Sequence, residues 1–404
     1  MVLWLGGYQI VIHSLETNLW SLQYLGQQED QPALALLPAV ADPPVDHMSA
    51  RLWQIRDLIE AGQLLRAETL LTPLVRSGDQ DVLRLQAELL TARGDLTAAL
   101  SLLATFGAVD ELLDMGQLAQ ASGRLDVAAL AYRTAYNIDA ERALLPLTRL
   151  LWREQNNLPD AEELLRHYIV AAPNSRYFTR WQLELGLLYR AQSEWEKAQS
   201  IFAQLVATEP DNAAAWIQLG WTYYDRGDGV ETAITQFQQA IAATPQEGEG
   251  YFAVATLLVK ERRYNEADLW FVQALEKEPS RQWWWEARAT AMKKTGNLKL
   301  STQIYEAIIE RFPNSISAHI EAALLYRRLE ERTKALESIE IALSLINPAD
   351  ENQRIVNASY YVHAGEIYEW SGAVHKAVAA YRQAQQLDPS RQEIQTRMQQ
   401  LLGS

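Results

Sequence analysis

The chain has 404 residues, of which 48% are hydrophobic and 22% charged, and its formal net charge is -15. This length exceeds what one compact core supports, so we expect several domains or a repeat array. The negative charge argues against binding of nucleic-acid phosphates, and the absence of cysteine excludes disulfides, thiolate nucleophiles and cysteine metal sites.

Residues 1–47 differ from the rest of the chain and are predicted to form a non-repeat segment. Residues 1–26 contain the apolar run "VLWLGGYQIVI", which fits a strand or part of an amphipathic helix, and residues 27–47 hold four prolines, which favours an extended linker. No Lys or Arg occurs before residue 51, and no apolar run reaches the ~18 to 20 residues that span a bilayer. We therefore predict neither a signal peptide nor a transmembrane helix.

Three interpretations of this segment stay open. It caps the first repeat, it docks through residues 1–26 on a neighbouring subunit or a membrane-embedded partner, or it is a cloning boundary or part of a longer chain.

Residues 48–391 carry a pattern that recurs about every 34 residues. One helix is indicated by Trp216, Leu219, Gly220 and Tyr223, at i, i+3, i+4 and i+7. A second helix follows with a small-x3-aromatic-x2-small stripe, and a proline then ends it. Seven such prolines recur at gaps of 37, 35, 34, 34, 35 and 41 residues: Pro173, Pro210, Pro245, Pro279, Pro313, Pro348 and Pro389.

On these motifs the chain resembles the tetratricopeptide repeat (TPR) family, whose signature is W-x2-L-G-x2-Y, then A-x3-F, then P. The stretch "WIQLGWTYY" through Pro245 matches each signature position, with one residue added in the "GDGV" turn. The resemblance implies an all-α, right-handed superhelical solenoid of about ten helix-turn-helix repeats over residues 48–391, with repeats one to four degenerate. Residues 392–404 are predicted to form a polar capping helix, because the last apolar face of an array has no neighbour.

The sequence shows no catalytic or metal-binding motif. The six histidines do not form H-E-x-x-H, and there is no G-x-S-x-G, P-loop or G-x-G-x-x-G motif. Asn357-Ala-Ser359 matches a glycosylation sequon, but three residues often match by chance. We expect a protein that is not an enzyme and that uses no cofactor or metal.

The resemblance also places residues on the groove that the first helices of such repeats line. An aromatic stripe is predicted there, and a basic ladder along its edge. The alternatives are that the rings serve packing between repeats and that the basic residues stabilise helix C-termini. The predicted binding residues are Trp221, Tyr224, Phe252, Trp283, Lys260, Lys293, Lys294, Arg327 and Arg328.

Two details sharpen this prediction. The Lys and Asn with which some TPR domains grip a chaperone's terminal carboxylate are replaced in one repeat by Ile217 and Trp221, which disfavours that ligand. In "WWW", adjacent helical residues point about 100° apart. Trp283 is therefore predicted to face the groove, Trp284 the preceding repeat, and Trp285 the second helix of its own repeat.

Three functions are consistent with these observations. The first is a scaffold that binds an apolar, partly acidic protein or peptide segment in the groove of repeats six to nine. The second is self-assembly into a homo-oligomeric ring or filament through the N-terminal segment and the terminal repeats. The third is a soluble part of a cell-envelope glycan system, because O-antigen ligase-like envelope proteins resemble this layout. The compartment is then cytoplasmic or envelope-associated.

Overall fold

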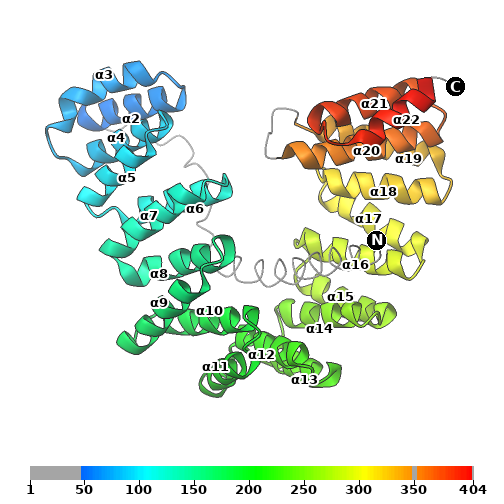
Figure 1. Ribbon diagram of the computed structural model, residues 1–404, viewed down its shortest axis with the longest axis horizontal. Helices are drawn as coiled ribbons and strands as arrows, with labels where there is room; N and C mark the ends of the chain where they lie inside the picture. The colour runs from blue at the N-terminus through cyan, green and yellow to red at the C-terminus, as the bar shows by residue number, and fades with distance from the viewer. Residues whose placement is uncertain (1–46, 348–352, 403–404) are drawn as a thin grey trace. The chain divides into compact units, whose positions relative to one another are not determined.

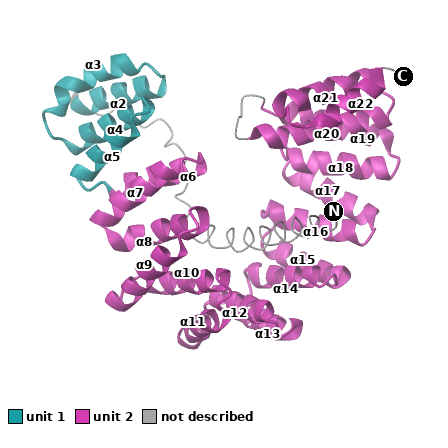
Figure 2. Ribbon diagram, in the orientation of Figure 1, with its two compact units in different colours: residues 1–108 teal, residues 109–404 magenta. Residues whose placement is uncertain are grey.

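The computed structural model describes residues 47–347 and 353–402. Within these ranges the chain forms 21 α-helices and one π-helix, with no strand among them, which confirms the all-α prediction (Figure 1). The chain divides into two compact units, residues 1–108 and 109–404 (Figure 2). The predictions for residues 1–46 fall outside the described residues. No helix in the described ranges is both long enough and apolar enough to cross a membrane.

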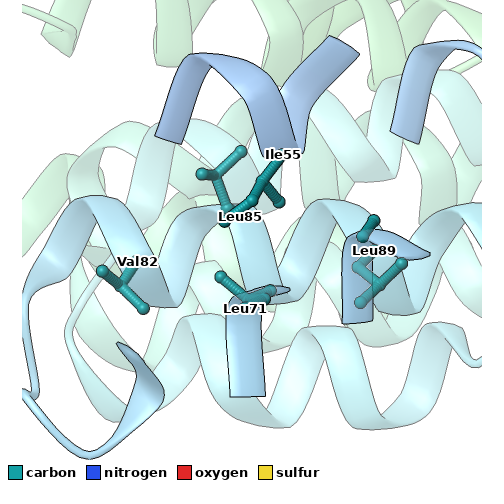
Figure 3. Close-up of a cluster of buried hydrophobic side chains, with 6 residues drawn as sticks. Ile55, Leu71, Val82, Leu85 and Leu89 are labelled. Carbon is teal, nitrogen blue, oxygen red and sulfur yellow. The ribbon is translucent and has the colours of Figure 1, made fainter. Parts of the chain in front are cut away.

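The first unit contains two helix pairs, and its bounds are α2 (His47–Glu60), α3 (Leu64–Val75), α4 (Gln80–Ala92) and α5 (Leu96–Thr105). Its core forms where apolar residues spaced three or four apart on α2, α3 and α4 meet. Figure 3 shows this cluster, in which each side chain is at most 4% exposed: Ile55, Ala67, Leu71, Val82, Leu85 and Leu89.

The second unit continues with eight further helix pairs and a final helix. Together with the first unit this gives ten pairs, in line with the predicted number of repeats. Its helices are α6 (Val109–Ala121), α7 (Leu125–Ile138), α8 (Ala140–Arg149), η1 (Leu150–Glu154), α9 (Leu158–Ala171), α10 (Phe178–Ala191), α11 (Trp195–Thr208), α12 (Ala213–Arg226), α13 (Val230–Ala243), α14 (Glu249–Lys260), α15 (Tyr264–Lys277), α16 (Gln282–Lys294), α17 (Leu298–Arg311), α18 (Ile316–Arg328), α19 (Arg332–Leu345), α20 (Arg354–Trp370), α21 (Val374–Leu387) and α22 (Gln392–Leu402).

The small-aromatic-small stripe of the second helices forms the core of each repeat. On α13, Ala233, Phe237 and Ala240 are all 0% exposed, and α15 and α21 bury their corresponding stripes in the same way. The ring lies against a residue of the first helix that has no side chain. A Cβ added at Gly220 would lie 2.6 Å from a ring carbon of Phe237. The glycine of the signature is therefore required by the close approach of the two helices.

A π-helical turn accommodates one extra residue in repeat four. The buried small residue Thr148 on α8 precedes Ala161 of the second helix by 13 positions, whereas Gly186 precedes Ala198 by 12 in the next repeat. The added residue is absorbed in η1, because a π-turn holds one residue more than an α-turn. The register of the apolar face is thereby kept on both sides of the turn.

Candidate functional site

The first helices of repeats six and seven bring three of the predicted binding residues together. On α12, the rings of Trp221 and Tyr224 meet edge to face with their centroids 6.1 Å apart. The Lys260 ammonium, at the end of α14, lies 5.3 Å from the Trp221 ring and 5.7 Å from the Tyr224 ring. We call these three residues the Lys260 cluster. All three are half-buried, so their polar and aromatic surface stays accessible.

The Tyr224 hydroxyl is fixed by a hydrogen bond that crosses the repeat boundary. It donates to a carboxylate oxygen of Glu261 at 2.7 Å. Burial, together with this bond, raises the pKa of Tyr224 above its ordinary value, so the phenol stays protonated. The Lys260 cluster is therefore held in position by its neighbours before any ligand arrives.

Phe252 belongs to the packing between repeats rather than to an open surface. On α14 it is 7% exposed, and its ring stacks on Trp284 with centroids 4.7 Å apart and planes 10° from parallel. The edge of Trp283 meets the same ring at 4.6 Å. The packing alternative thus describes Phe252, while Trp283 remains half-buried and retains an accessible side.

The three adjacent tryptophans occupy three different environments on α16. Trp284 is 1% exposed and packs on the preceding repeat, as its register predicts. Trp285 contacts the second helix of its own repeat, as predicted, but it is half-buried, so the accompanying expectation that it belongs to the core is wrong. Its Nε1 donates to the carbonyl of Pro279 at 3.0 Å, and the Arg311 guanidinium lies 5.3 Å from its ring.

The bond from Trp285 to a proline carbonyl recurs in other repeats. Trp216 donates from Nε1 to the carbonyl of Pro210 at 2.9 Å, and a nitrogen of the His319 ring lies 3.0 Å from the carbonyl of Pro313. In each case the ring follows its proline by six residues. The sequence contains this spacing, and it is the signal by which the contact could have been predicted.

The basic ladder divides into paired and unpaired residues. Lys293 forms an ion pair with Glu321 at 2.7 Å, and Arg327 one with Glu366 at 3.2 Å. Lys294 and Arg328 are exposed, and neither side chain has a hydrogen bond or ion pair within the described ranges. Within the described ranges, Lys294 and Arg328 are therefore the ladder residues whose positive charge no acid of the chain neutralises at close range.

A pocket of about 660 Å³ opens between α18, α20, α21 and α22, which gather at the C-terminal end of the second unit (Figure 1). We call it the end pocket. Sequence reasoning proposed the two arginines of α18 as ligands but did not connect them with the final helix. Its lining residues are Arg327, Arg328, Val362, Glu366, Glu369, Trp370, Tyr381, Glu393, Ile394 and Arg397.

A buried ionic cluster that the sequence analysis missed joins repeats four and five. Glu184 on α10 is 1% exposed and accepts hydrogen bonds, each 2.9 Å long, from Arg149, Arg153 and the indole of Trp152. Burial works to raise the pKa of the Glu184 carboxyl, but the two guanidinium groups outweigh it and hold the pKa below its ordinary value. Glu184 is thus ionised and structural.

Two neighbouring carboxyl groups lie beside the Trp284 ring. Arg281 contacts both, donating to Glu249 at 2.9 Å and to Glu278 at 2.6 Å, and its guanidinium lies 5.4 Å from the Trp284 ring. Glu278 also accepts from the backbone N–H of Gly248 at 2.8 Å. Burial, followed by the proximity of Glu278, raises the pKa of Glu249 to about 7.

This pair predicts a loss of stability with rising pH around α14 and α16. Because the folded pKa of Glu249 exceeds its ordinary 4.5, the folded state binds its proton more tightly than the unfolded state. Folding is therefore favoured at low pH and weakens as the pH rises through about 7. We expect a decrease of about 1 to 3 kcal/mol between about pH 5 and about pH 8, measured by urea unfolding. Glu249→Gln should remove this slope, and an unchanged slope in that variant would contradict the assignment.

Two further features bear on chemistry. The described residues contain no group of three or more His, Cys, Asp or Glu side chains arranged to hold a metal ion. Asn357 of the sequon lies within α20 and is 5% exposed, so its side chain is not presented for glycosylation while the helix is folded.

Comparison with known proteins identifies the repeats. Family models described as tetratricopeptide repeat match residues 183–248, 217–282 and 358–391. Transcription factor tau subunit sfc4 of Schizosaccharomyces pombe is 23% identical over 163 residues, which are 38% of this chain and 16% of that protein. Protein O-mannosyl-transferase Tmtc1 of Drosophila melanogaster is 26% identical over 120 residues, which are 29% and 14% of the two chains. The chain thus matches less than a fifth of either relative's length.

Solved structures with a similar fold include other repeat proteins. A tetratricopeptide repeat protein from Parabacteroides merdae has a TM-score of 0.38 at 18% identity, covering 65% of this chain and 98% of that one. The C-terminal part of a TPR repeat-containing protein from Cytophaga hutchinsonii has a TM-score of 0.47 at 15% identity, covering 61% and 96%. The stretches that the family models match fall on α10 to α16 and on α20 to α21, in the part of the chain that forms helix pairs. The chain is therefore a protein with tetratricopeptide repeats, which the family models match over residues 183–282 and 358–391.

Proposed function

We propose that the chain is a non-enzymatic scaffold that binds an extended, apolar and partly acidic peptide segment of a partner protein along repeats six to nine, α12 to α19. Repeat arrays of this kind use their extended surfaces for binding. The observation that carries the proposal is the Lys260 cluster, in which a cation lies over two half-buried rings. An aromatic surface with a fixed charge is a common composition of binding hot spots.

The unpaired basic residues support the acidic character of the partner. Lys294 and Arg328 occupy the same register on α16 and α18, 34 residues apart, and both are exposed. Neither is paired with an acid among the described residues, so there a carboxylate of a bound segment gains an opposite charge without the loss of an ion pair between those residues.

The names of the two relatives do not indicate which class of partner this chain binds. One is named as a transcription factor subunit and the other as a mannosyltransferase, and each shares a stretch of 120 to 163 residues with this chain. The shared stretches are 38% and 29% of this chain, and a repeat fold of the kind seen in this chain serves many roles. The proposal therefore rests on the side chains of repeats six to nine.

The test uses peptides selected from a random display library on the intact chain and measured by isothermal titration calorimetry. Trp221→Ala is expected to weaken binding of a selected peptide about 5- to 30-fold, because it removes an aromatic contact of the Lys260 cluster. Trp53→Ala is the matched control, since this tryptophan is 45% exposed on α2, in the other unit. Phe252 is unsuitable, because its truncation would disturb the packing on Trp284. Unchanged affinity in Trp221→Ala, with helicity intact, would reject the proposal.

A further inference from the structure

The end pocket is built from the last repeats and the final helix. Val362, Glu366, Glu369 and Trp370 follow one another on α20 at i, i+4, i+7 and i+8, so they share one face of that helix. The two arginines that end α18 border this face, and α22 contributes Glu393, Ile394 and Arg397. Tyr381 comes from α21, the second helix of the last repeat.

Most of the charge in the end pocket is neutralised internally. Arg327 pairs with Glu366 at 3.2 Å. Arg397 donates twice to Glu369, at 2.6 and 3.0 Å, and the Tyr381 hydroxyl donates to the same carboxylate at 3.2 Å. Of the six charged residues that line the pocket, only Arg328 and Glu393 then lack an ion pair within the described residues.

Of these two residues, Arg328 is the one that we expect to bind a ligand. Glu393 lies in the first turn of α22, where the partial positive charge of the helix N-terminus offsets its charge. Arg328 follows Lys294 at the same register one repeat later, so a segment bound along repeats eight and nine passes the unpaired Lys294 and then meets the unpaired Arg328 at the end pocket. A carboxylate is therefore the complementary charge on that approach.

Apolar surface lies beside Arg328 in the same pocket. Trp370 is 39% exposed, Val362 is half-buried, and Ile394 closes the lining with 2% exposure. An exposed indole in a pocket of about 660 Å³ leaves room for a bulky side chain to replace water on an apolar wall.

We propose that the end pocket is an anchor site for a partner peptide, which inserts a bulky apolar side chain against Trp370 and Val362 while an adjacent acidic residue pairs with Arg328. This inference rests on the proposed function, because it names a chemistry for one end of the same bound segment. It adds α20 and α22 to the binding surface. It also assigns the two arginines different roles, because Arg328 binds the ligand whereas Arg327 is paired with Glu366.

The probe is the peptide fluorescein-Gly-Ser-Phe-Asp-Glu-Gly-amide, labelled at its N-terminal amine, titrated with the intact chain and followed by fluorescence anisotropy. We expect Arg328→Glu to weaken its binding at least about 10-fold, and Trp370→Ala to weaken it about 5-fold or more. Lys299→Glu is the matched control, because Lys299 is an exposed cation on α17 outside the pocket. Arg328→Lys should restore part of the affinity, and circular dichroism verifies that each variant is folded.

Peptide controls test the chemistry of the site. Replacing Phe by Ala, or Asp-Glu by Lys-Lys, should each abolish the titration. Tighter binding of the Lys-Lys peptide would overturn the inference in favour of a cation-binding pocket. No titration with the original peptide, or equal affinity in wild type and Arg328→Glu, would also overturn it.

The two proposals fail in different ways. Trp221→Ala lies outside the end pocket, so it should leave binding of this short probe unchanged while weakening peptides selected from the library. If Arg328→Glu has no effect on either ligand, the anchor site is wrong and the proposed function stands. If Trp221→Ala has no effect on the selected peptides but Arg328→Glu weakens the probe, the reverse holds.

Discussion

Glu184→Ala is expected to destabilise the region of α8 to α10 by about 3 to 5 kcal/mol, the range for removing one partner of a buried ion pair. The carboxylate is 1% exposed and accepts bonds from Arg149, Arg153 and Trp152, so its removal takes this anion away from two guanidinium groups that are largely shielded from water. Each repeat contacts only its neighbours, so a group of adjacent repeats can unfold while the others stay folded. The loss of stability should therefore appear as faster amide exchange in these helices. Hydrogen exchange resolved by helix measures it directly.

The matched control is an ion pair between the same residue types that stays in water. Arg56 and Glu88 lie 3.2 Å apart with both side chains 43% exposed. Glu88→Ala should change stability by less than about 1 kcal/mol, because solvent screens such a pair. The lowered pKa of Glu184 also gives a sign: its contribution is present at neutral pH and is lost on acidification through the folded pKa, below 4.5. Equal effects of the two substitutions would contradict the burial argument.

Trp284→Ala is expected to cost about 3 to 5 kcal/mol, the range for truncating a large buried ring. Its ring is 1% exposed, stacks on Phe252 and fills the space above Gly248, so the cavity opens between two repeats. The chain supplies its own controls in the adjacent tryptophans. Trp283→Ala and Trp285→Ala should each cost about half as much or less, since both rings are half-buried.

Thermal unfolding of the three variants, together with amide exchange of α14 and α16, separates these outcomes. The exchange of α14 should increase in Trp284→Ala, because that helix carries Phe252. A uniform loss in all three variants would show that the aromatic group acts as one layer rather than as three side chains in separate environments.

The repeat and its core follow from spacing alone. Ala233, Phe237 and Ala240 could be assigned to a buried stripe because intervals of four and three residues place them on one helical face, and all three are 0% exposed. The glycine before them was equally predictable, since its partner ring is part of the same signature. Local periodicity decides these positions, and no distant residue changes them.

The solvent exposure of side chains at the contacts between neighbouring repeats could not be predicted from spacing. Phe252 stands in a groove position by register, yet the ring of Trp284 on the next first helix covers it. A neighbour's size decides exposure there, and the family signature does not record it. From the sequence alone, Glu184 resembles a solvent-exposed residue of a helix. In the structure, Trp152 and Arg153, which lie in the π-turn of repeat four, donate hydrogen bonds to it.

The end pocket shows the same limit at greater separation. Arg328 and Arg397 line one pocket although 69 positions separate them in the chain, and the final helix carries no signature that sets its position. The sequence indicates a basic edge. Which of its two arginines pairs with Glu366, and which has no ion pair among the described residues, depends on the packing of α18, α20 and α22.

The bonds from Trp216, Trp285 and His319 to the preceding proline carbonyls define where the chain can be cut. Each bond closes the end of one repeat with a ring that belongs to the next. A shortened protein that stops at Pro279 would therefore expose a carbonyl that its own repeat cannot satisfy, whereas one that extends past Trp285 retains the bond. Fragment boundaries for expression or crystallisation are better placed within the following first helix than at the prolines that mark the period.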